Sequence, residues 1–375
     1  MGYNVDFTRR NTNVKPKTAQ QLAKDNLIVR HYAGSRAYGT ALPTSDTDFR
    51  GIFVGDPVNI RTPFFRVDEV KVQGEEDTVM YELANFMKLA VDCNPNVVET
   101  LWVDMSDVTF QHPAYMLMRE AAPKLLSSRI AFTTSGYALA QLKRIRGHNK
   151  WINNPQEKEP PRQTDFLTLV HNFTTLRMFK FNALEYREGH SFVPYGGAGN
   201  GTIFGVYEKP GAQLFSDDWT LNVAEYEGNT HELGTPLFLV KFNKDVYNAA
   251  KEKWAQYWTW KRERNEVRSE LEEQYGYDTK HAMHLVRLLR MGVEALTEGK
   301  LYVRRPDAEE LLAIRAGAWT YEQVVEYAEM MDHKVREELL PKTFLPKKPN
   351  VNLAAQLTLE VQDAVWTTMK KNSKQ

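Results

Sequence analysis

Apolar residues in the first hundred positions form short extended runs. Residues 27–33 (Leu-Ile-Val-Arg-His-Tyr-Ala) predict a strand that stops at Gly34, after a helix that ends near residue 26. A second strand is predicted over residues 46–54, because the Gly-Asp-Pro triplet at 55–57 is typical of a chain break. This part of the chain therefore predicts a small sheet.

A hairpin and an amphipathic helix are predicted next. Residues 67–73 and 77–81 are extended in pattern and flank a turn at Gly74. Residues 82–92 predict a helix, because their apolar members recur at helical spacing: Leu83, Phe86, Met87 and Ala90. Residues 97–103 return to an extended pattern. A strand that runs directly into a helix is therefore expected around residue 82.

From about residue 112 the pattern becomes helical, with one interruption. Long helices are predicted over residues 130–147 and 165–187, whereas residues 190–240 are rich in glycine and then alternate, which favours strands and turns. The run Gly196 to Gly201 lacks the Lys-Ser/Thr of a phosphate-binding loop and predicts a hairpin turn. Later helices are predicted over residues 243–273, 279–297, 306–315, 321–340 and 353–370.

These elements predict an α+β protein of two domains. We expect a mixed sheet with helices in residues 1–110, and a mainly helical domain in residues 111–375 with a β-rich insertion at about residues 190–240. A chain of 375 residues is too long for most single cores, which supports more than one domain.

Composition narrows the classes of protein. Hydrophobic residues make up 42% and charged residues 26%, as in globular proteins, and no apolar run is long enough to span a bilayer. Cys93 is the only cysteine, which excludes an internal disulfide and a cysteine-rich zinc site. The N-terminus lacks the apolar core of a secretory signal, so we expect a cytoplasmic protein that does not bind a membrane.

Charge gives no general sign of nucleic-acid binding. Lys plus Arg and Asp plus Glu both number 48, so the net charge is zero. Basic residues gather locally at residues 143–150, 261–264 and 287–290, and we interpret each group as a solvated helix face.

The segment richest in chemistry joins Gly34-Ser35 to Asp46 and Asp48. A strand that ends in Gly-Ser offers backbone N–H groups and a hydroxyl to a phosphate. Two aspartates two positions apart on a strand leave the same face, with Cα atoms roughly 6.6 Å apart. Neighbouring carboxylates repel unless a cation lies between them, and Mg²⁺ prefers such oxygen ligands. The pattern predicts a divalent metal site, Mg²⁺ or Mn²⁺, at Asp46 and Asp48 that also binds phosphates.

This segment resembles the signature of the DNA polymerase beta-type nucleotidyltransferases, Gly-Ser followed by Asp-x-Asp. Within that superfamily the chain is most similar to the RlaP-like (YcgL-like) predicted nucleotidyltransferases. The further matches are Tyr81-Glu82-Leu83, Asn94-Pro95, Glu99-Thr100-Leu101, residues 276–284 and Arg305-Pro306-Asp307. The resemblance covers the N-terminal part well and the later helices in patches, and it does not extend to residues 190–240.

The resemblance implies a third catalytic carboxylate on the strand after Asp-x-Asp. Asp77 is the first choice, because it opens a strand that runs into a helix; Glu99 and Glu82 are the alternatives. Lys280 follows a predicted helix start at Asp278-Thr279, where anions bind favourably. The residues expected to bind the nucleotide are Gly34, Ser35, Arg36, Tyr38, Arg50 and Lys280.

The function that the resemblance implies is transfer of a nucleoside monophosphate from an NTP to a hydroxyl, with release of pyrophosphate. A link to RNA repair favours an RNA or tRNA end as acceptor, and a protein side chain or a small molecule is the alternative. An inert nucleotide- or RNA-binding module, antitoxin-like or a scaffold, is the alternative from another class. His281 and His284 lie three apart on a predicted helix, but no cysteine or nearby histidine completes a zinc site with them.

Overall fold

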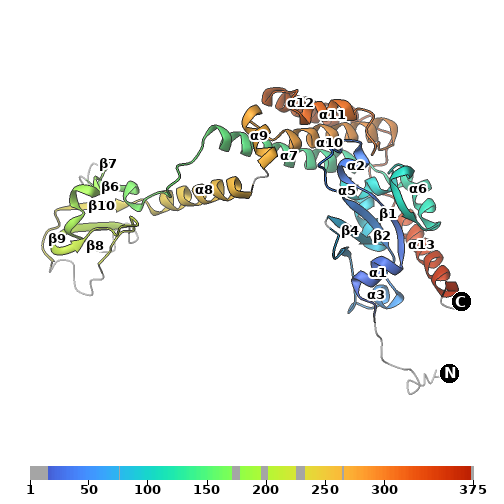
Figure 1. Cartoon of the computed structure of the whole chain (residues 1–375), viewed down its shortest axis with the longest axis horizontal. Coiled ribbons are helices and arrows are strands. Elements are labelled where there is room, and N and C mark those ends of the chain that lie inside the picture. Colours follow the sequence, from blue (N-terminus) through green and yellow to red (C-terminus); the bar gives the residue numbers. More distant parts are fainter. Residues whose placement is uncertain are drawn as a thin grey trace, which may run out of the picture. The chain divides into compact units, whose positions relative to one another are not determined.

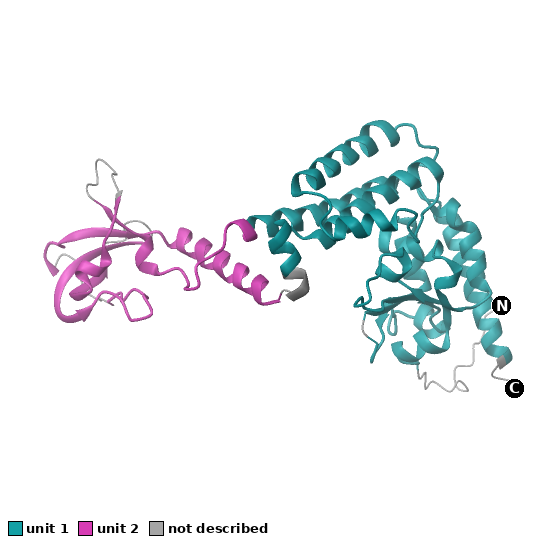
Figure 2. Ribbon diagram, turned by 45° about the horizontal axis from the view of Figure 1, so that its top comes forward, with its two compact units in different colours: residues 1–150, 270–375 teal, residues 151–269 magenta. Residues whose placement is uncertain are grey.

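The computed structural model describes residues 16–75, 77–170, 178–195, 202–224, 233–263 and 266–372. Contacts divide the chain into two compact units, and Figure 2 colours them separately. The first unit comprises residues 1–150 and 270–375, and the second comprises residues 151–269. Within the described residues, no helix has both the length and the apolar character that a membrane crossing requires.

A mixed five-stranded sheet forms the centre of the first unit. Its strands, in chain order, are β1 Leu27–Tyr32, β2 Phe49–Phe53, β3 Glu69–Lys71, β4 Thr78–Glu82 and β5 Val108–Gln111. Their spatial order is β3-β4-β2-β1-β5, and β2 and β4 pair in parallel while the other neighbours are antiparallel. The predicted α+β class with a mixed sheet is confirmed.

Helices from both ends of the chain cover this sheet. They are α1 Ala19–Asp25, α4 Leu83–Val91, α6 Ala114–Leu125 and α13 Val351–Asn372. The apolar face predicted for α4 is buried, and α13 packs against α4 and α6 in one core with the strands (Figure 1). Because the last helix completes the first core, the division of the chain does not fall near residue 110.

The remaining long helices of the first unit form a second core. They are α7 Arg129–Asn153, α10 Thr279–Glu298, α11 Ala308–Arg315 and α12 Tyr321–His333. Asp278 caps the start of α10, and Gly299 ends it in a left-handed conformation, as the sequence predicts. The α-helical part of the helix predicted over residues 321–340 ends at His333. A π-helical turn, Lys334–Leu339, follows it directly and extends the helical path.

Two short helices replace extended structure near the sheet. Residues 97–103 were expected to be extended, and this expectation is wrong: α5 Pro95–Val98 and a 3₁₀ turn, Glu99–Leu101, occupy most of them. Asn94 caps α5 through its side chain and Pro95 occupies the first turn, and both features start helices. The remaining short helix of this region is α3 Pro57–Arg61.

The second unit contains an antiparallel five-stranded sheet in the order β7-β6-β10-β9-β8. Its strands are β6 Leu167–Val170, β7 Met178–Lys180, β8 Glu188–Pro194, β9 Ile203–Gln213 and β10 Phe238–Phe242, and helix α8 Lys244–Glu263 follows them. Helix α9 Glu266–Tyr275 leads back to the first unit.

The helix predicted over residues 165–187 is wrong in its described parts. Strand β6 pairs with both β10 and β7, and this pairing buries Leu167 and Phe181 in a core with Val240. Pairing with a strand some seventy positions later leaves no local signal, so tertiary contacts override the helical spacing. The strands predicted within residues 190–240 are present, and the predicted turn from Gly196 to Gly201 lies outside the described residues.

Candidate active site

The parallel pair of β2 and β4 brings two aspartates to one edge of the sheet. Phe49 lies opposite Thr78 at the first paired position, so Asp48 and Asp77 each directly precede the start of a neighbouring strand. Asp46 comes two residues before Asp48. We call Asp46, Asp48 and Asp77 the strand-edge carboxylates.

The aspartates of the Asp-x-Asp motif lie just before β2 and not within it. The strand begins at Phe49, whereas the sequence predicted a start at residue 46. Asp46 is exposed and Asp48 is half-buried. The backbone of Asp48 still continues the ladder, because Ala33 N–H donates to its carbonyl oxygen over 2.9 Å. This bond aligns the end of β1 with the motif.

Gly34 lies directly against the Asp48 carboxylate. Its φ is +58°, and an added Cβ would lie 2.1 Å from Asp48 Oδ2. Only glycine fits both the left-handed backbone and the close approach. From Gly34 the chain enters a short helix, α2 Gly34–Tyr38, and Ser35 is half-buried in it. The Gly-Ser motif and Asp48 are thus neighbours in space.

The charges around Asp48 define the electrostatics of this edge. Burial raises the pKa of the Asp48 carboxyl above its usual range; Asp77 and Asp46 add to the rise, while Arg50 and Lys280 oppose it. The two cations come from different parts of the fold, β2 and the first turn of α10. Like charges held this close favour a bound cation.

Arg50 also fastens the two strand starts to each other. Its Nη1 donates to the carbonyl oxygens of Phe49 over 2.9 Å and Asp77 over 2.7 Å. Asp77 has a φ of +52°, a conformation that non-glycine residues rarely adopt. This backbone contact holds Asp77 at the sheet edge. Arg36, in contrast, is exposed, and its Nη2 donates to the carbonyl oxygen of Ser45 over 3.4 Å.

Glu99 lies in a buried ion pair instead of on an open surface. Arg287 Nη1 donates to Glu99 Oε1 over 2.6 Å, and the Tyr38 hydroxyl donates to Glu99 Oε2 over 2.8 Å. The Arg287 guanidinium also lies 3.9 Å from the centre of the Tyr38 ring. Arg287 is only 5% exposed, so its interpretation as part of a solvated helix face is wrong.

Glu82 is the other alternative for the third carboxylate, and it lies at the far end of β4 from Asp77. Its side chain accepts hydrogen bonds from the N–H groups of Gly55 over 3.2 Å and Ala84 over 2.7 Å. Burial raises the pKa of the Glu82 carboxyl, and these backbone bonds oppose the rise. Glu82 therefore caps the start of α4.

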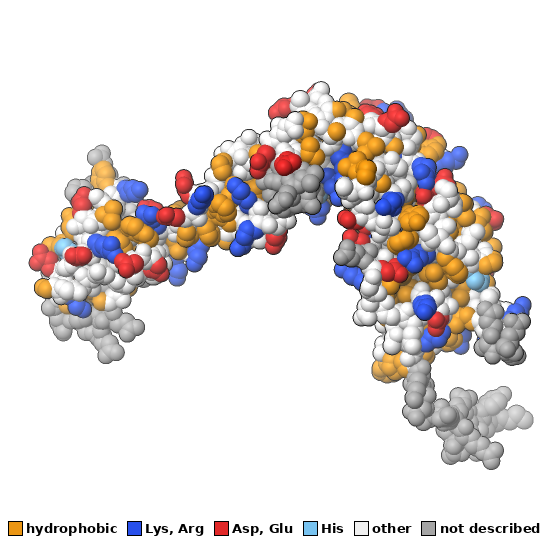
Figure 3. All heavy atoms as spheres, viewed as in Figure 1, with side chains coloured by type: hydrophobic (Ala, Val, Ile, Leu, Met, Phe, Trp, Pro, Cys, Tyr) orange, Lys and Arg blue, Asp and Glu red, His pale blue; other side chains and the backbone are white. Residues whose placement is uncertain are grey.

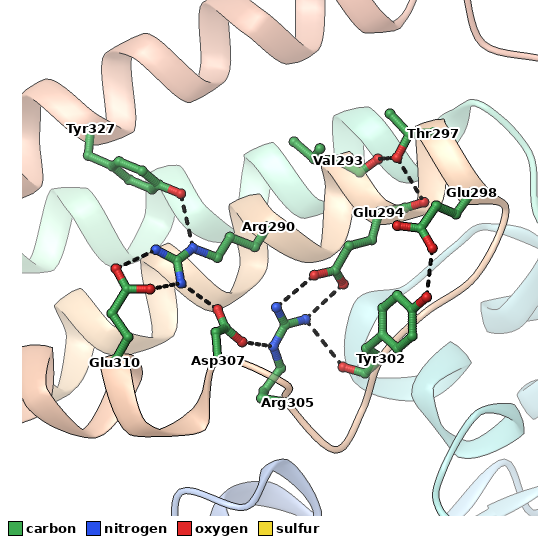
Figure 4. A network of polar contacts seen from close by, with 10 residues as sticks. All are labelled: Arg290, Val293, Glu294, Thr297, Glu298, Tyr302, Arg305, Asp307, Glu310 and Tyr327. Atoms are coloured by element: carbon green, nitrogen blue, oxygen red, sulfur yellow. Dashed lines mark hydrogen bonds and ion pairs between the residues drawn. The ribbon is translucent and has the colours of Figure 1, made fainter.

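A network of ion pairs joins α10 to α11 and to the segment that precedes α11 (Figure 4). Arg305 pairs with Glu294 and Asp307, and its backbone N–H donates to the carbonyl oxygen of Tyr38 over 3.0 Å. Arg290 contacts Asp307, Glu310 and Tyr327. This network fixes the helical core against α2, which begins with Gly34.

A cavity of about 700 Å³ opens beside Gly34. Its walls come from α2, α5, α7 and α10 and include side chains that the sequence did not single out: Asn96, Phe132, Tyr137, Gln141 and Leu288. Arg144 and His284 also line it. Burial, together with the nearby charges of Arg287 and Lys280, lowers the pKa of His284 to about 3, so this ring is neutral at pH 7. Helical spacing alone does not reveal a wall shared by helices distant in sequence.

Comparison with known proteins adds one match. Residues 9–159 match the family described as RlaP, the RNA repair pathway DNA polymerase beta family. The resemblance inferred from the sequence is confirmed over these residues. No curated protein and no solved structure matches the chain. The RlaP match covers the strand-edge carboxylates and the Gly-Ser helix, and its description indicates a polymerase-beta-like nucleotidyltransferase of RNA repair.

Proposed function

We propose that this protein transfers a nucleoside monophosphate from an NTP to a hydroxyl group, in a reaction that depends on a divalent metal. The observation that supports the proposal is the parallel register of β2 and β4, because Asp77 directly precedes β4 as Asp48 directly precedes β2, and Asp48 lies against Gly34. The RlaP match supports the same reaction class.

Asp46 and Asp48 would hold Mg²⁺ or Mn²⁺, since clustered carboxylate oxygens suit these hard cations. The bound ion would neutralise charge on the triphosphate as it reacts. Gly34 and Ser35 would bind the β- and γ-phosphates, and Lys280 and Arg50 would add positive charge. Arg36 and Tyr38 are weaker candidates, because Arg36 points to Ser45 and Tyr38 is committed to Glu99.

Asp77 is the best candidate for the third carboxylate. It is exposed at the strand edge and raises the pKa of Asp48, whereas Glu99 is paired with Arg287 and Glu82 caps α4. The acceptor oxygen would form a bond to the α-phosphorus while the bond to the bridging oxygen breaks and pyrophosphate leaves. Asp77 would accept the proton of the attacking hydroxyl or hold the ion that binds it.

The cavity beside Gly34 offers room for the nucleoside part of the NTP. Tyr137 and Phe132 provide aromatic surface, and Gln141 and Arg144 provide hydrogen-bonding groups. In this arrangement the sheet domain carries the catalytic groups, and α7 and α10 complete the nucleotide site. We propose that the sheet carries out catalysis, as in polymerase-beta-like enzymes, while the helices bind the nucleotide.

The acceptor that we propose is an RNA or tRNA end, because the family description names an RNA repair pathway. On the visible face in Figure 3, Lys and Arg side chains alternate with Asp and Glu side chains, so RNA contact would be local. The alternative acceptors are a protein side chain and a small molecule. The alternative function is that of an inert binding module. Cytoplasmic location stays a prediction.

The test is transfer of label from each of the four α-labelled NTPs, with Mg²⁺ or Mn²⁺, to total RNA, tRNA or protein. We expect labelled RNA with one preferred NTP and none in the Asp46→Asn, Asp48→Asn double variant. Equal labelling by that variant would refute the proposed metal site. Mg²⁺-dependent binding of NTP without transfer to any acceptor would favour the inert module.

A further inference from the structure

Two histidines and two buried carboxylates meet where α7, α9 and α10 come together. His148 Nδ1 lies 3.5 Å from Asp278 Oδ2 and 3.8 Å from Glu272 Oε1. One ligand atom from each of these three residues lies within 4.8 Å of the other two. His281 Nε2 lies 3.5 Å from the same Asp278 Oδ2. The side chains of His148, Glu272 and Asp278 therefore converge on one small volume, and His281 lies beside Asp278.

The surrounding fold holds this group in place. Asp278 is fully buried and Glu272 is 2% exposed. Asp278 Oδ1 accepts the N–H of His281 over 2.9 Å, which caps α10 and orients Oδ2 towards both imidazole rings. The rings of His148 and His281 lie 5.9 Å apart between their centres. Three separate helices thus supply side chains that face one another.

We propose that His148, Glu272, Asp278 and His281 form a Zn²⁺ site. Ligands at about 2.0–2.1 Å from a tetrahedral ion lie roughly 3.3 Å from one another. Asp278 Oδ2 lies at a similar distance, 3.5 Å, from a ring nitrogen of His148 and from one of His281. Imidazole nitrogen with carboxylate oxygen suits Zn²⁺, whereas Mg²⁺ prefers oxygen alone. The site is chemically distinct from the all-oxygen strand-edge carboxylates.

The site has a structural role by its position. His148 lies near the end of α7, Glu272 on α9, and Asp278 and His281 at the start of α10. A metal bound to all four would tie the end of α7 to the first turn of α10. The sequence did not predict this metal site, because His148 and His281 are 133 positions apart in the chain.

The experiment measures Zn²⁺ binding to the full-length chain. Asp46→Asn and Asp48→Asn are introduced into the parent protein so that the strand-edge carboxylates do not bind the ion. After equilibrium dialysis against Zn²⁺, we expect about one ion per chain, and a rise in Tm. Co²⁺ in place of Zn²⁺ should give the intense visible absorption of a tetrahedral site.

Variants locate the ion. His148→Ala and His281→Ala should each weaken Zn²⁺ binding by at least about a hundredfold and abolish the rise in Tm. His333→Ala, which changes an exposed histidine at the end of α12, is the matched control and should bind as the parent does. Glu272→Gln provides a milder change if an alanine variant fails to fold, and it should also weaken binding.

The proposal is overturned if the parent binds no Zn²⁺, because the cluster would then be a network of polar contacts that needs no metal. It is also overturned if folded His148→Ala or Glu272→Gln binds as tightly as the parent. Both outcomes are independent of nucleotidyl transfer, since the parent used here lacks the aspartates assigned to catalysis.

Discussion

The acidic residues of the first unit are arranged in two opposite ways. The strand-edge carboxylates Asp46, Asp48 and Asp77 gather on one edge, and burial together with the repulsion from Asp77 and Asp46 raises the pKa of Asp48. Glu99, in contrast, is buried against Arg287 and Tyr38. A buried charge requires a partner to offset its desolvation, whereas charges gathered at an open edge are suited to a ligand. The presence or absence of a buried cationic partner therefore distinguishes acids that stabilise the fold, such as Glu99, from acids that are suited to binding a ligand, such as Asp48.

The largest expected effect is on stability. Arg287→Ala leaves Glu99 buried without its cation and should lower the free energy of unfolding by about 3–5 kcal/mol. Asp48→Asn should leave it unchanged or raise it, because a carboxyl with a raised pKa is less stable as an anion in the folded state than in the unfolded state. Denaturant unfolding followed by circular dichroism measures both.

A control tests the reason for that loss. The double variant Glu99→Gln, Arg287→Met removes both charges at once and should be more stable than Arg287→Ala alone. If Asp48→Asn and Arg287→Ala lowered the free energy of unfolding equally, the distinction between the strand-edge carboxylates and the buried Glu99 would be contradicted.

The next effect separates Asp77 from Glu99 by activity. Asp77→Asn should reduce kcat for nucleotidyl transfer by at least about a hundredfold, the range expected when a general base is lost. Glu99→Gln should act mainly through stability, since Glu99 contacts Tyr38 and Arg287. Steady-state kinetics at a temperature where both variants are folded distinguishes the roles. The reverse pattern would make Glu99 the catalytic acid.

A smaller effect is expected at Lys280, the cation near Asp48 in the first turn of α10. Lys280→Ala should raise the KM for NTP about tenfold, because a charge-assisted contact to phosphate is lost. Added salt should weaken NTP binding less in this variant. Lys300→Ala, an exposed lysine beyond the other end of α10, is the control. A lower Tm with an unchanged KM would make Lys280 structural.

The last effect concerns a buried histidine that stays neutral. Burial lowers the pKa of His31 to about 4, although its bond to the Tyr32 carbonyl opposes the shift. The unfolded chain binds a proton near pH 6.5, so stability is complete above that pH and falls as pH drops towards 4. Each extra proton bound by the unfolded chain contributes about 1.4 kcal/mol per pH unit.

His31→Gln removes that proton and should flatten the pH dependence. The measurement compares the free energy of unfolding at pH 7 and pH 5 in the two proteins. His284, whose pKa is lowered in the same direction, remains in both and supplies the residual slope. An identical slope in the variant would show that His31 does not titrate on unfolding.

Local features of the fold were readable from the sequence. The apolar spacing of α4, the capping of α10 by Asp278 and its end at Gly299 were all predicted and are all present. Each rests on residues within one or two turns of one another, where side-chain spacing fixes the exposed face. The helix predicted over residues 165–187 was wrong because pairing with β10 decided that segment.

The candidate site divides in the same way. The sequence by itself determined the Gly-Ser and Asp-x-Asp motif and the repulsion of its aspartates, whereas the structure showed why residue 34 must be glycine. Only the tertiary structure placed Asp77 beside Asp48, paired Glu99 with Arg287 across 188 positions, and brought His148 to Asp278. Motifs are local because a few adjacent residues set their geometry. Residues distant in the chain come into contact only through sheet pairing and helix packing. The local spacing of apolar residues contains no information about such contacts.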